Sequence, residues 1–314
     1  MTSIKNEEVD ASSSELASGS SGDDGAVCYL CLDGGLDNAD QPLRRDCACR
    51  GTDAGFVHLA CLTKYAAAKS VQWDGREMNE FSEPWDTCPS CRQEYQNELA
   101  IDIAKMFVPF VRRQYPDDTR RQVESLQLKL SALNNMLYRL QPVQKREAEV
   151  TANVILSLID RMKNDAPLSR RYSSFAAYAH NVHGRIALQE GTEESARRAV
   201  VHFEKDLKVS KAFGDADDIA TAKDNIAYAK SKYEGDNNIE ELLETSRELY
   251  KLRITTDGEE SEYTIRAGKQ YALRLQKADR RDEARELLTK LLATSKQVLG
   301  TNHNTTKNIE LSLK

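Results

Sequence analysis

Eight potential metal ligands, seven cysteines and one histidine, are spaced as four pairs in the first hundred residues of this 314-residue chain. They include every cysteine in the sequence, and the pairs read Cys28-x-x-Cys31, Cys47-x-Cys49, His58-x-x-Cys61 and Cys88-x-x-Cys91. A short gap between two ligands lets both reach one ion, and zinc prefers four sulfur or nitrogen donors in a tetrahedron. Eight donors are enough for two structural Zn²⁺ ions, so the spacing predicts a zinc-binding domain over residues 26–98.

Residues 26–98 are too few and too polar to fold on an apolar core alone, and small domains usually need a metal or another cross-link. Structural zinc contributes roughly 10–16 kcal/mol of apparent binding energy to folding. Disulfides are the other common use of cysteine, but seven is an odd number and the first ten residues lack the apolar segment of a secretory signal. We therefore expect a soluble protein of a reducing compartment, cytoplasmic or nuclear, with metal-bound cysteines.

Composition narrows the classes of partner. The net charge is −6 and the basic residues are interleaved with acids, whereas a nucleic-acid-binding face is usually basic, so we expect no nucleic-acid partner. No apolar run approaches the roughly 18–20 residues that span a bilayer, so we expect no membrane span. Residues 1–25 are rich in serine, glycine and acids, and they predict a disordered tail because they offer little apolar surface to bury.

The rest of the chain predicts helices, so the expected fold class is mainly α. Residues 70–87 are expected to form a loop that lies back on the zinc core. A helical hairpin is predicted over 99–166, with Pro109 bending or ending its first helix. Before Pro142, apolar residues recur at spacings of three and four and form a stripe on one face of a helix. The stripe consists of Val123, Leu126, Leu130, Leu133, Leu137 and Leu140. The helix predicted over about 143–163 has an apolar face formed by Val150, Val154, Ile155, Leu158, Ile159 and Met162. Packing of these two helices against each other is the simplest interpretation, and a coiled coil is the alternative.

From residue 167 to 314 the sequence repeats. Three stretches each predict two helices joined by a short turn, with the turns at 191–194, 234–238 and 277–282. Thr264 and Thr306 are 42 residues apart, and Gly258 and Gly300 stand near the ends of successive second helices, where glycine is a favoured cap. A fixed period of this length indicates a stacked helical solenoid. The last stretch, 304–314, is expected to form one more first helix.

The zinc-ligand region resembles the RING-CH, or RING-variant, finger. The resemblance lies in the run CACRGTDAGFVHLACLTKY, with its Cys-x-Cys pair, its Gly-Thr, and an aromatic residue and valine before His58. The resemblance implies a cross-brace in which Cys28, Cys31, His58 and Cys61 hold one zinc ion and the other is held by Cys47, Cys49, Cys88 and Cys91. Because protein would then fill all four positions on each ion, both ions would be structural.

RING-type domains act as ubiquitin ligases, which hold a ubiquitin-conjugating enzyme and its ubiquitin thioester in a reactive pose. Such a domain catalyses by positioning and has no catalytic nucleophile of its own. The resemblance implies that Leu32 is an apolar contact for the conjugating enzyme and that Pro89 lies in the second contact loop. It also implies that Arg92 bridges the conjugating enzyme and ubiquitin through its planar set of donors. The alternative is that Leu32 packs on its own turn and Arg92 is simply exposed.

The repeats resemble tetratricopeptide (TPR) repeats of the kinesin-light-chain type. In that family the second helix ends at Leu-Gly and is followed by His-x-x-Thr. Here Leu299-Gly300 is followed by HNTT at 303–306. The resemblance implies a TPR-like solenoid whose concave groove holds a protein substrate or partner.

Three functions remain open from the sequence. The first is a soluble ubiquitin ligase, and the second is a non-catalytic adaptor that uses the zinc domain and the repeats only to bind proteins. The third is a histone-tail reader similar to PHD fingers, although their second ligand pair has a gap of two residues. His180 and His183 are one helical turn apart and could bind a metal, but the sequence shows no cysteine or acid to join them. A packing or surface role is the simpler interpretation.

Overall fold

The computed structural model describes residues 26–37, 40–47, 49, 55–73, 78–165, 169–213, 216–234 and 238–313. In this part of the chain the regular elements are helices, so the fold class is mainly α, as predicted. The tail predicted over residues 1–25 lies outside the described residues. Among the described helices we find no segment with the length and hydropathy needed to span a bilayer.

The cysteine-rich region begins with loops, continues in helical elements and ends in a further turn at the last cysteine pair. Isolated bridges join its loops at Leu36–Pro42, Arg44–Val57 and Thr87–Glu94. Its helical elements are α1 (Leu59–Val71), α2 (Met78–Ser82) and the 3₁₀ turn η1 (Glu83–Trp85). The prediction of a loop over 70–87 is therefore wrong for residues 70–71 and 78–85, while residues 74–77 lie outside the described residues. Phe81 and Trp85 are fully buried, and the helical turns around them bring both rings into the core.

Helix α3 (Asn97–Gln114) completes the core of the cysteine-rich region. The ring of Phe107 stacks on Trp85 with 4.8 Å between the centroids, and the ring of Phe110 lies 5.1 Å from the same indole. The indole Nε1 donates to Ser70 Oγ over 2.8 Å and so ties η1 to α1. The helix continues through Pro109, which rules out an end there, the second of the two predicted outcomes. An interior proline costs about 3 kcal/mol, and the burial of large side chains on both sides of it offsets this cost.

Helices α4 (Thr119–Asn135) and α5 (Pro142–Asp165) form the next layer, with α4 packed on α3 and α5 leading to α6. All six residues of the predicted stripe are buried, which confirms that α4 packs against its neighbours. Leu137 and Leu140 reach this core from the connection after α4. On α5, Ile155 and Leu158 are buried as predicted, but Val150 is 54% exposed and does not belong to the apolar face.

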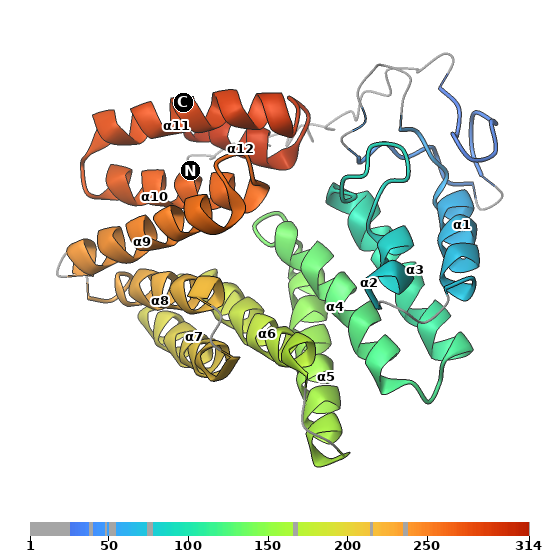
Figure 1. The fold of residues 1–314 in the computed structure, drawn as a ribbon, viewed down its shortest axis with the longest axis horizontal. Helices are drawn as coiled ribbons and strands as arrows, with labels where there is room; N and C mark the ends of the chain where they lie inside the picture. Colours follow the sequence, from blue (N-terminus) through green and yellow to red (C-terminus); the bar gives the residue numbers. More distant parts are fainter. Residues whose placement is uncertain are drawn as a thin grey trace, which may run out of the picture.

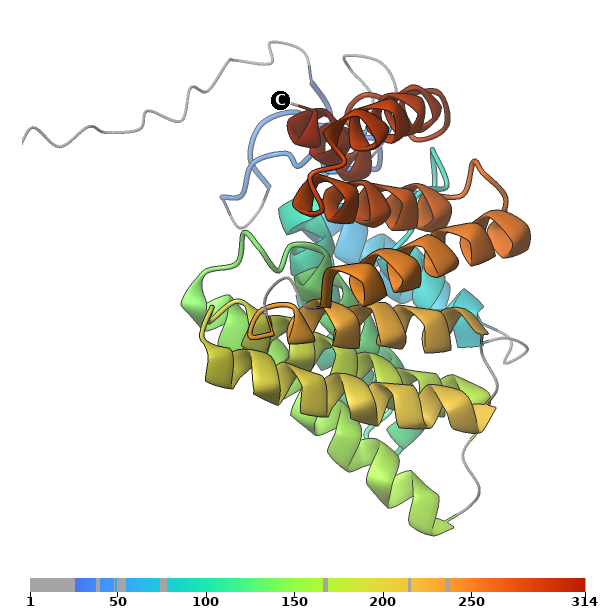
Figure 2. The ribbon, with the colours of Figure 1, turned by 90° about the vertical axis from the view of Figure 1, so that its left-hand side faces the viewer.

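Between residues 169 and 313 the described chain forms three helical hairpins and one final helix. Figure 2 shows the hairpins stacked in order, with the last helix on the end of the stack. The elements are α6 (Arg170–Leu188), α7 (Glu193–Phe213), α8 (Ala216–Lys230), α9 (Ile239–Asp257), α10 (Glu262–Lys277), α11 (Arg281–Val298) and α12 (Asn304–Ser312). This order matches the predicted repeat of two helices and the predicted extra helix at the end.

Two threonines confirm the 42-residue period between the last two units. Thr264 Oγ1 donates to the carbonyl of Arg253 over 3.0 Å, and Thr306 Oγ1 donates to the carbonyl of Ser295 over 3.3 Å. In both cases the acceptor lies on the preceding second helix, eleven residues before the threonine. The glycines after α9 and α11 have φ angles of +83° and +91°, which favour glycine. The repeat is therefore visible in single contacts as well as in the order of helices.

The chain curves so that α12 returns to the cysteine-rich region (Figure 1). The backbone N–H of Asn304 donates to Gln96 Oε1 over 3.1 Å, and its side-chain amide donates to Asn97 Oδ1 over 2.8 Å. We call this pair of hydrogen bonds the closing contact. It joins the first turn of the last helix to the segment that follows the last cysteine pair.

Candidate metal centre

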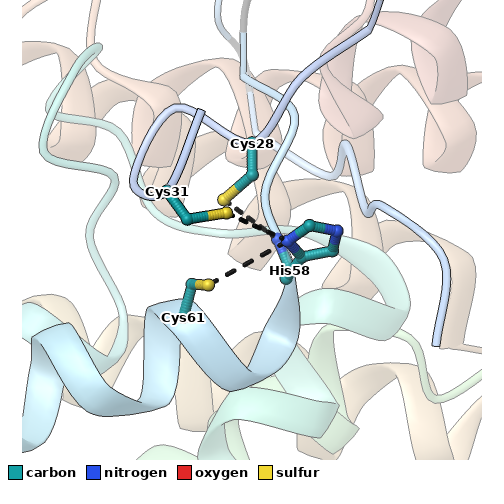
Figure 3. Close-up of side chains that lie close together, drawn as sticks. All are labelled: Cys28, Cys31, His58 and Cys61. Atoms are coloured by element: carbon teal, nitrogen blue, oxygen red, sulfur yellow. Dashed lines mark hydrogen bonds between the residues drawn. The ribbon is translucent and has the colours of Figure 1, made fainter. Parts of the chain in front are cut away.

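The first ligand group consists of Cys28, Cys31, His58 and Cys61, whose donor atoms lie within 4.8 Å of one another. The first two come from a loop, while His58 precedes α1 and Cys61 lies in its first turn (Figure 3). The Nδ1 atom of His58 is 3.4 Å from Cys31 Sγ and 3.9 Å from Cys61 Sγ. Zinc–ligand bonds of about 2.0–2.3 Å place tetrahedral neighbours about 3.6 Å apart, so these separations suit one shared ion.

One hydrogen bond indicates which nitrogen of His58 carries the proton. The Nε2 atom lies 3.2 Å from the carbonyl oxygen of Gly35. Because a carbonyl can only accept, Nε2 carries the proton and Nδ1 keeps its lone pair on the side of the cysteines. Metal-binding histidines usually donate their outer N–H in this way. The ring is only 3% exposed, so its orientation is also fixed by packing.

The second ligand group consists of Cys47, Cys49, Cys88 and Cys91, again with donor atoms within 4.8 Å of one another. Cys49 Sγ and Cys88 Sγ are 3.7 Å apart, close to the separation of about 3.8 Å expected for two thiolates on one zinc ion. Gly55 borders this group with a φ of +84°, and a Cβ at this position would lie 2.8 Å from Cys47 Sγ. Glycine is therefore required beside these thiols, which the spacing of the ligands does not reveal.

The grouping follows the order that the RING-CH resemblance implies. The first pair of ligands joins the third pair, and the second pair joins the fourth. The two groups therefore interleave along the chain, and neither can form from a single short segment. Two of the pairs, Cys28–Cys31 and Cys88–Cys91, lie in tight turns, and the pair His58–Cys61 lies at the start of α1.

The thiols also influence each other's acidity. The thiol of Cys47 donates to Cys88 and lowers the pKa of Cys88 to about 5. Burial raises the pKa of Cys49 and that of Cys61 to about 12. The thiols would therefore not all ionise by themselves at neutral pH, and a divalent cation would supply the charge that favours the thiolates. Seven sulfurs and one imidazole are the kind of donor set that zinc prefers.

The two Cys-x-x-Cys pairs form equivalent turns. The N–H of Leu32 donates to the carbonyl of Cys28 over 2.8 Å, and the N–H of Arg92 donates to the carbonyl of Cys88 over 2.9 Å. Leu32 and Arg92 both have positive φ angles, +65° and +58°. Leu32 is 74% exposed, so it does not pack on its own turn. Pro89, inside the second turn, is half-buried.

The guanidinium of Arg92 has a partner within the same region. Its Nη1 donates to Glu83 Oε1 over 3.3 Å. The side chains are 76% and 50% exposed, and ion pairs as exposed as this contribute at most about 1 kcal/mol. Arg92 can therefore exchange Glu83 for another acceptor at little cost.

A third group of potential ligands lies away from the cysteines, in the first hairpin of the repeats. His180 and His183 lie on α6, as predicted, and His202 comes from α7. The ring centroid of His202 is 4.9 Å from that of His183 and 6.0 Å from that of His180. Sequence reasoning missed His202, although the predicted pairing of these two helices was the signal that could have found it.

No protein-family model matches the chain, and no curated protein matches it. One similar solved structure is BtubC (BKLC) from P. vanneervenii, with 17% identity and a TM-score of 0.48 over 69% of this chain and 81% of that chain. Two others are structures of a putative kinesin light chain from Podosopora anserina with nearly identical TPR-like repeats, one of them of a variant with a single substitution. Both are 13% identical and cover 76% of this chain and 95% of that chain, with TM-scores of 0.38 and, for the variant, 0.40. These similarities concern the course of the helices, and we take no activity from them.

Proposed function

We propose that this chain is a RING-CH-type ubiquitin-protein ligase that binds two structural zinc ions, a ubiquitin-conjugating enzyme with its ubiquitin, and a protein substrate on the helical repeats. The observation that supports this best is the interleaving of the two ligand groups. The turn at Cys28–Cys31 belongs to one group and the turn at Cys88–Cys91 to the other, so both turns belong to one folded region. Leu32 and Arg92 project from these turns and are exposed. The zinc ions would hold the turns in place, and protein ligands would fill their coordination.

Leu32 would supply binding energy for the conjugating enzyme. Burying a leucine side chain contributes about 1.5–3 kcal/mol, which corresponds to about a 10- to 150-fold change in affinity. Arg92 would release Glu83 and donate to the conjugating enzyme and ubiquitin, holding the thioester where a substrate lysine can attack it. The chain would thus accelerate transfer by positioning the two reactants.

A non-catalytic adaptor is the second candidate. The exposure of Leu32 supports it as well, because an exposed apolar side chain on a turn can bind a partner protein without any transfer of ubiquitin. In this case the same turns would bind a partner protein, and the repeats would bind another, without transfer of ubiquitin.

Autoubiquitination with a panel of conjugating enzymes tests the proposal. In Leu32→Ala, transfer should fall tenfold or more while zinc content and circular dichroism stay unchanged, because the side chain is exposed. Val143→Ala is the matched control, since Val143 is an apolar residue that is 79% exposed on α5, and its activity should stay within twofold of wild type. Cys47→Ser should lose activity together with zinc.

The outcomes separate the two candidates. If zinc-loaded wild type forms no ubiquitin chains with any enzyme of the panel, the ligase proposal is wrong. If the wild type then still binds a conjugating enzyme and Leu32→Ala does not, the turns are a binding surface and the adaptor is the better description.

A further inference from the structure

Three of the five histidines of the chain meet in the first hairpin of the repeats, far along the sequence from the cysteines. His180 and His183 are three residues apart on α6, so they share one face of that helix. His202 reaches them from α7, and its ring is stacked on His183 at an interplanar angle of 25°. The cluster therefore joins two helices.

Each of the three rings has one nitrogen that is shielded from solvent. These atoms are His180 Nδ1, His183 Nε2 and His202 Nδ1, and none has a hydrogen-bond partner in the described part of the chain. A buried polar atom without a partner costs about 1–3 kcal/mol. Such atoms in native proteins usually indicate a bound ion, an ordered water or a functional role. Three of them in one cluster therefore point to a ligand.

The rings are in the protonation state that metal binding needs. Burial lowers the pKa of His180 and that of His202 to about 4, and it also lowers the pKa of His183. All three imidazoles are thus neutral at pH 7, and each has one nitrogen with a free lone pair. Lys205, on the same helix as His202, adds to the lowering at all three rings.

We propose that His180, His183 and His202 form a transition-metal site that links α6 to α7. Imidazole nitrogens suit zinc, nickel and copper, and three protein ligands leave a coordination position for water or another small ligand. The donor nitrogens of the three rings do not all lie within 4.8 Å of one another, so the stacked pair would have to tilt to direct both nitrogens at one ion. The nearby ammonium of Lys205 would oppose the charge of the metal and weaken its binding.

Nickel binding to the full, zinc-loaded chain tests the site. In isothermal titration calorimetry with Ni²⁺, wild type should bind one equivalent, and the ion should raise the Tm because it joins two helices. His202→Gln should weaken binding tenfold or more and abolish the rise in Tm. Lys205→Gln should strengthen binding, a change that simple loss of structure would not produce. Circular dichroism of each variant checks that the hairpin remains folded.

Three results would overturn the proposal. The first is a wild-type chain that binds no Ni²⁺. The second is a His202→Gln variant that binds as tightly as wild type, because two histidines on α6 would then account for the binding. The third is a nickel–thiolate absorption band at one equivalent of Ni²⁺, together with a nickel affinity that His180→Gln leaves unchanged. The ion would then be bound by the cysteines.

Discussion

Replacing Trp85 should weaken zinc binding although the indole is not a ligand. Trp85 is fully buried, stacks on Phe107 and donates to Ser70, so it connects η1, α1 and α3. It also lies three residues before the ligand Cys88. If the metal-free region is unfolded, as small zinc domains commonly are, the free energy of metal binding includes the free energy of folding. Any loss of packing must then appear as a loss of zinc affinity.

The expected size follows from the burial of the indole. Substitution of a buried tryptophan by alanine costs about 3–5 kcal/mol. If this loss is divided equally between the two zinc ions, it amounts to about 1.5–2.5 kcal/mol for each ion. The apparent dissociation constant for each zinc ion should therefore rise about 10- to 70-fold. Trp85→Phe should lose much less, because it keeps a ring against Phe107 and forfeits chiefly a hydrogen bond worth about 1 kcal/mol.

Competition with a chromophoric chelator measures this on the full chain. The control is Tyr138→Ala, which removes an aromatic ring that is 78% exposed and should leave the zinc affinity within twofold of wild type. The reasoning is refuted if Trp85→Ala lowers the unfolding midpoint but leaves zinc affinity within threefold. That result would mean that the region folds without metal.

Three further changes have expected outcomes that urea unfolding can measure. Stability should fall as the pH drops from about 6.5 to about 4. In that range the unfolded chain protonates His180 and His202, whereas the folded chain, in which their pKa is about 4, does not. A fall of equal size in the variant with both His180→Gln and His202→Gln would contradict this. Arg171→Ala should lower stability by about 1–3 kcal/mol, because it leaves Glu124, a carboxylate that is 3% exposed, without its bidentate partner, while Arg171 itself is 35% exposed. An unchanged stability would show that water replaces the guanidinium at no cost. Gly184→Ala should lower stability by about 1–3 kcal/mol, because its Cβ would lie 2.5 Å from the buried ring of Phe203 on α7. An unchanged urea midpoint would mean that this ring can move aside.

Features that depend on local spacing could be predicted from the sequence. The ligand pairs are such a feature, because a gap of one or two residues by itself directs two donors at one ion. The stripe on α4 and the 42-residue period are others, since helical geometry repeats every few residues and stacked units repeat their contacts. Thr264 and Thr306 show this directly, because each bonds the carbonyl eleven residues before it.

Features that depend on distant packing could not be predicted. Local propensity predicts a bend or an end of the helix at Pro109, and burial of Phe107 and Phe110 against Trp85 keeps the helix continuous. The segment 70–87 is irregular by composition, yet its residues 78–85 are helical because Phe81 and Trp85 enter the core that α3 completes. His202 joins His183 only because two helices cross at that point. No periodic pattern marks such single contacts, so they become visible only in the fold.

The closing contact has a consequence for the order of events during synthesis. Its two sides are 207 residues apart, so at about 5–20 residues per second the ribosome needs roughly 10–40 s to make the second side after the first. Throughout that interval the segment after Cys91 lacks the partner that α12 provides. Any folding of the cysteine-rich region in that interval depends on its own ligand groups and on the core that it shares with α3, without the hydrogen bonds from Asn304.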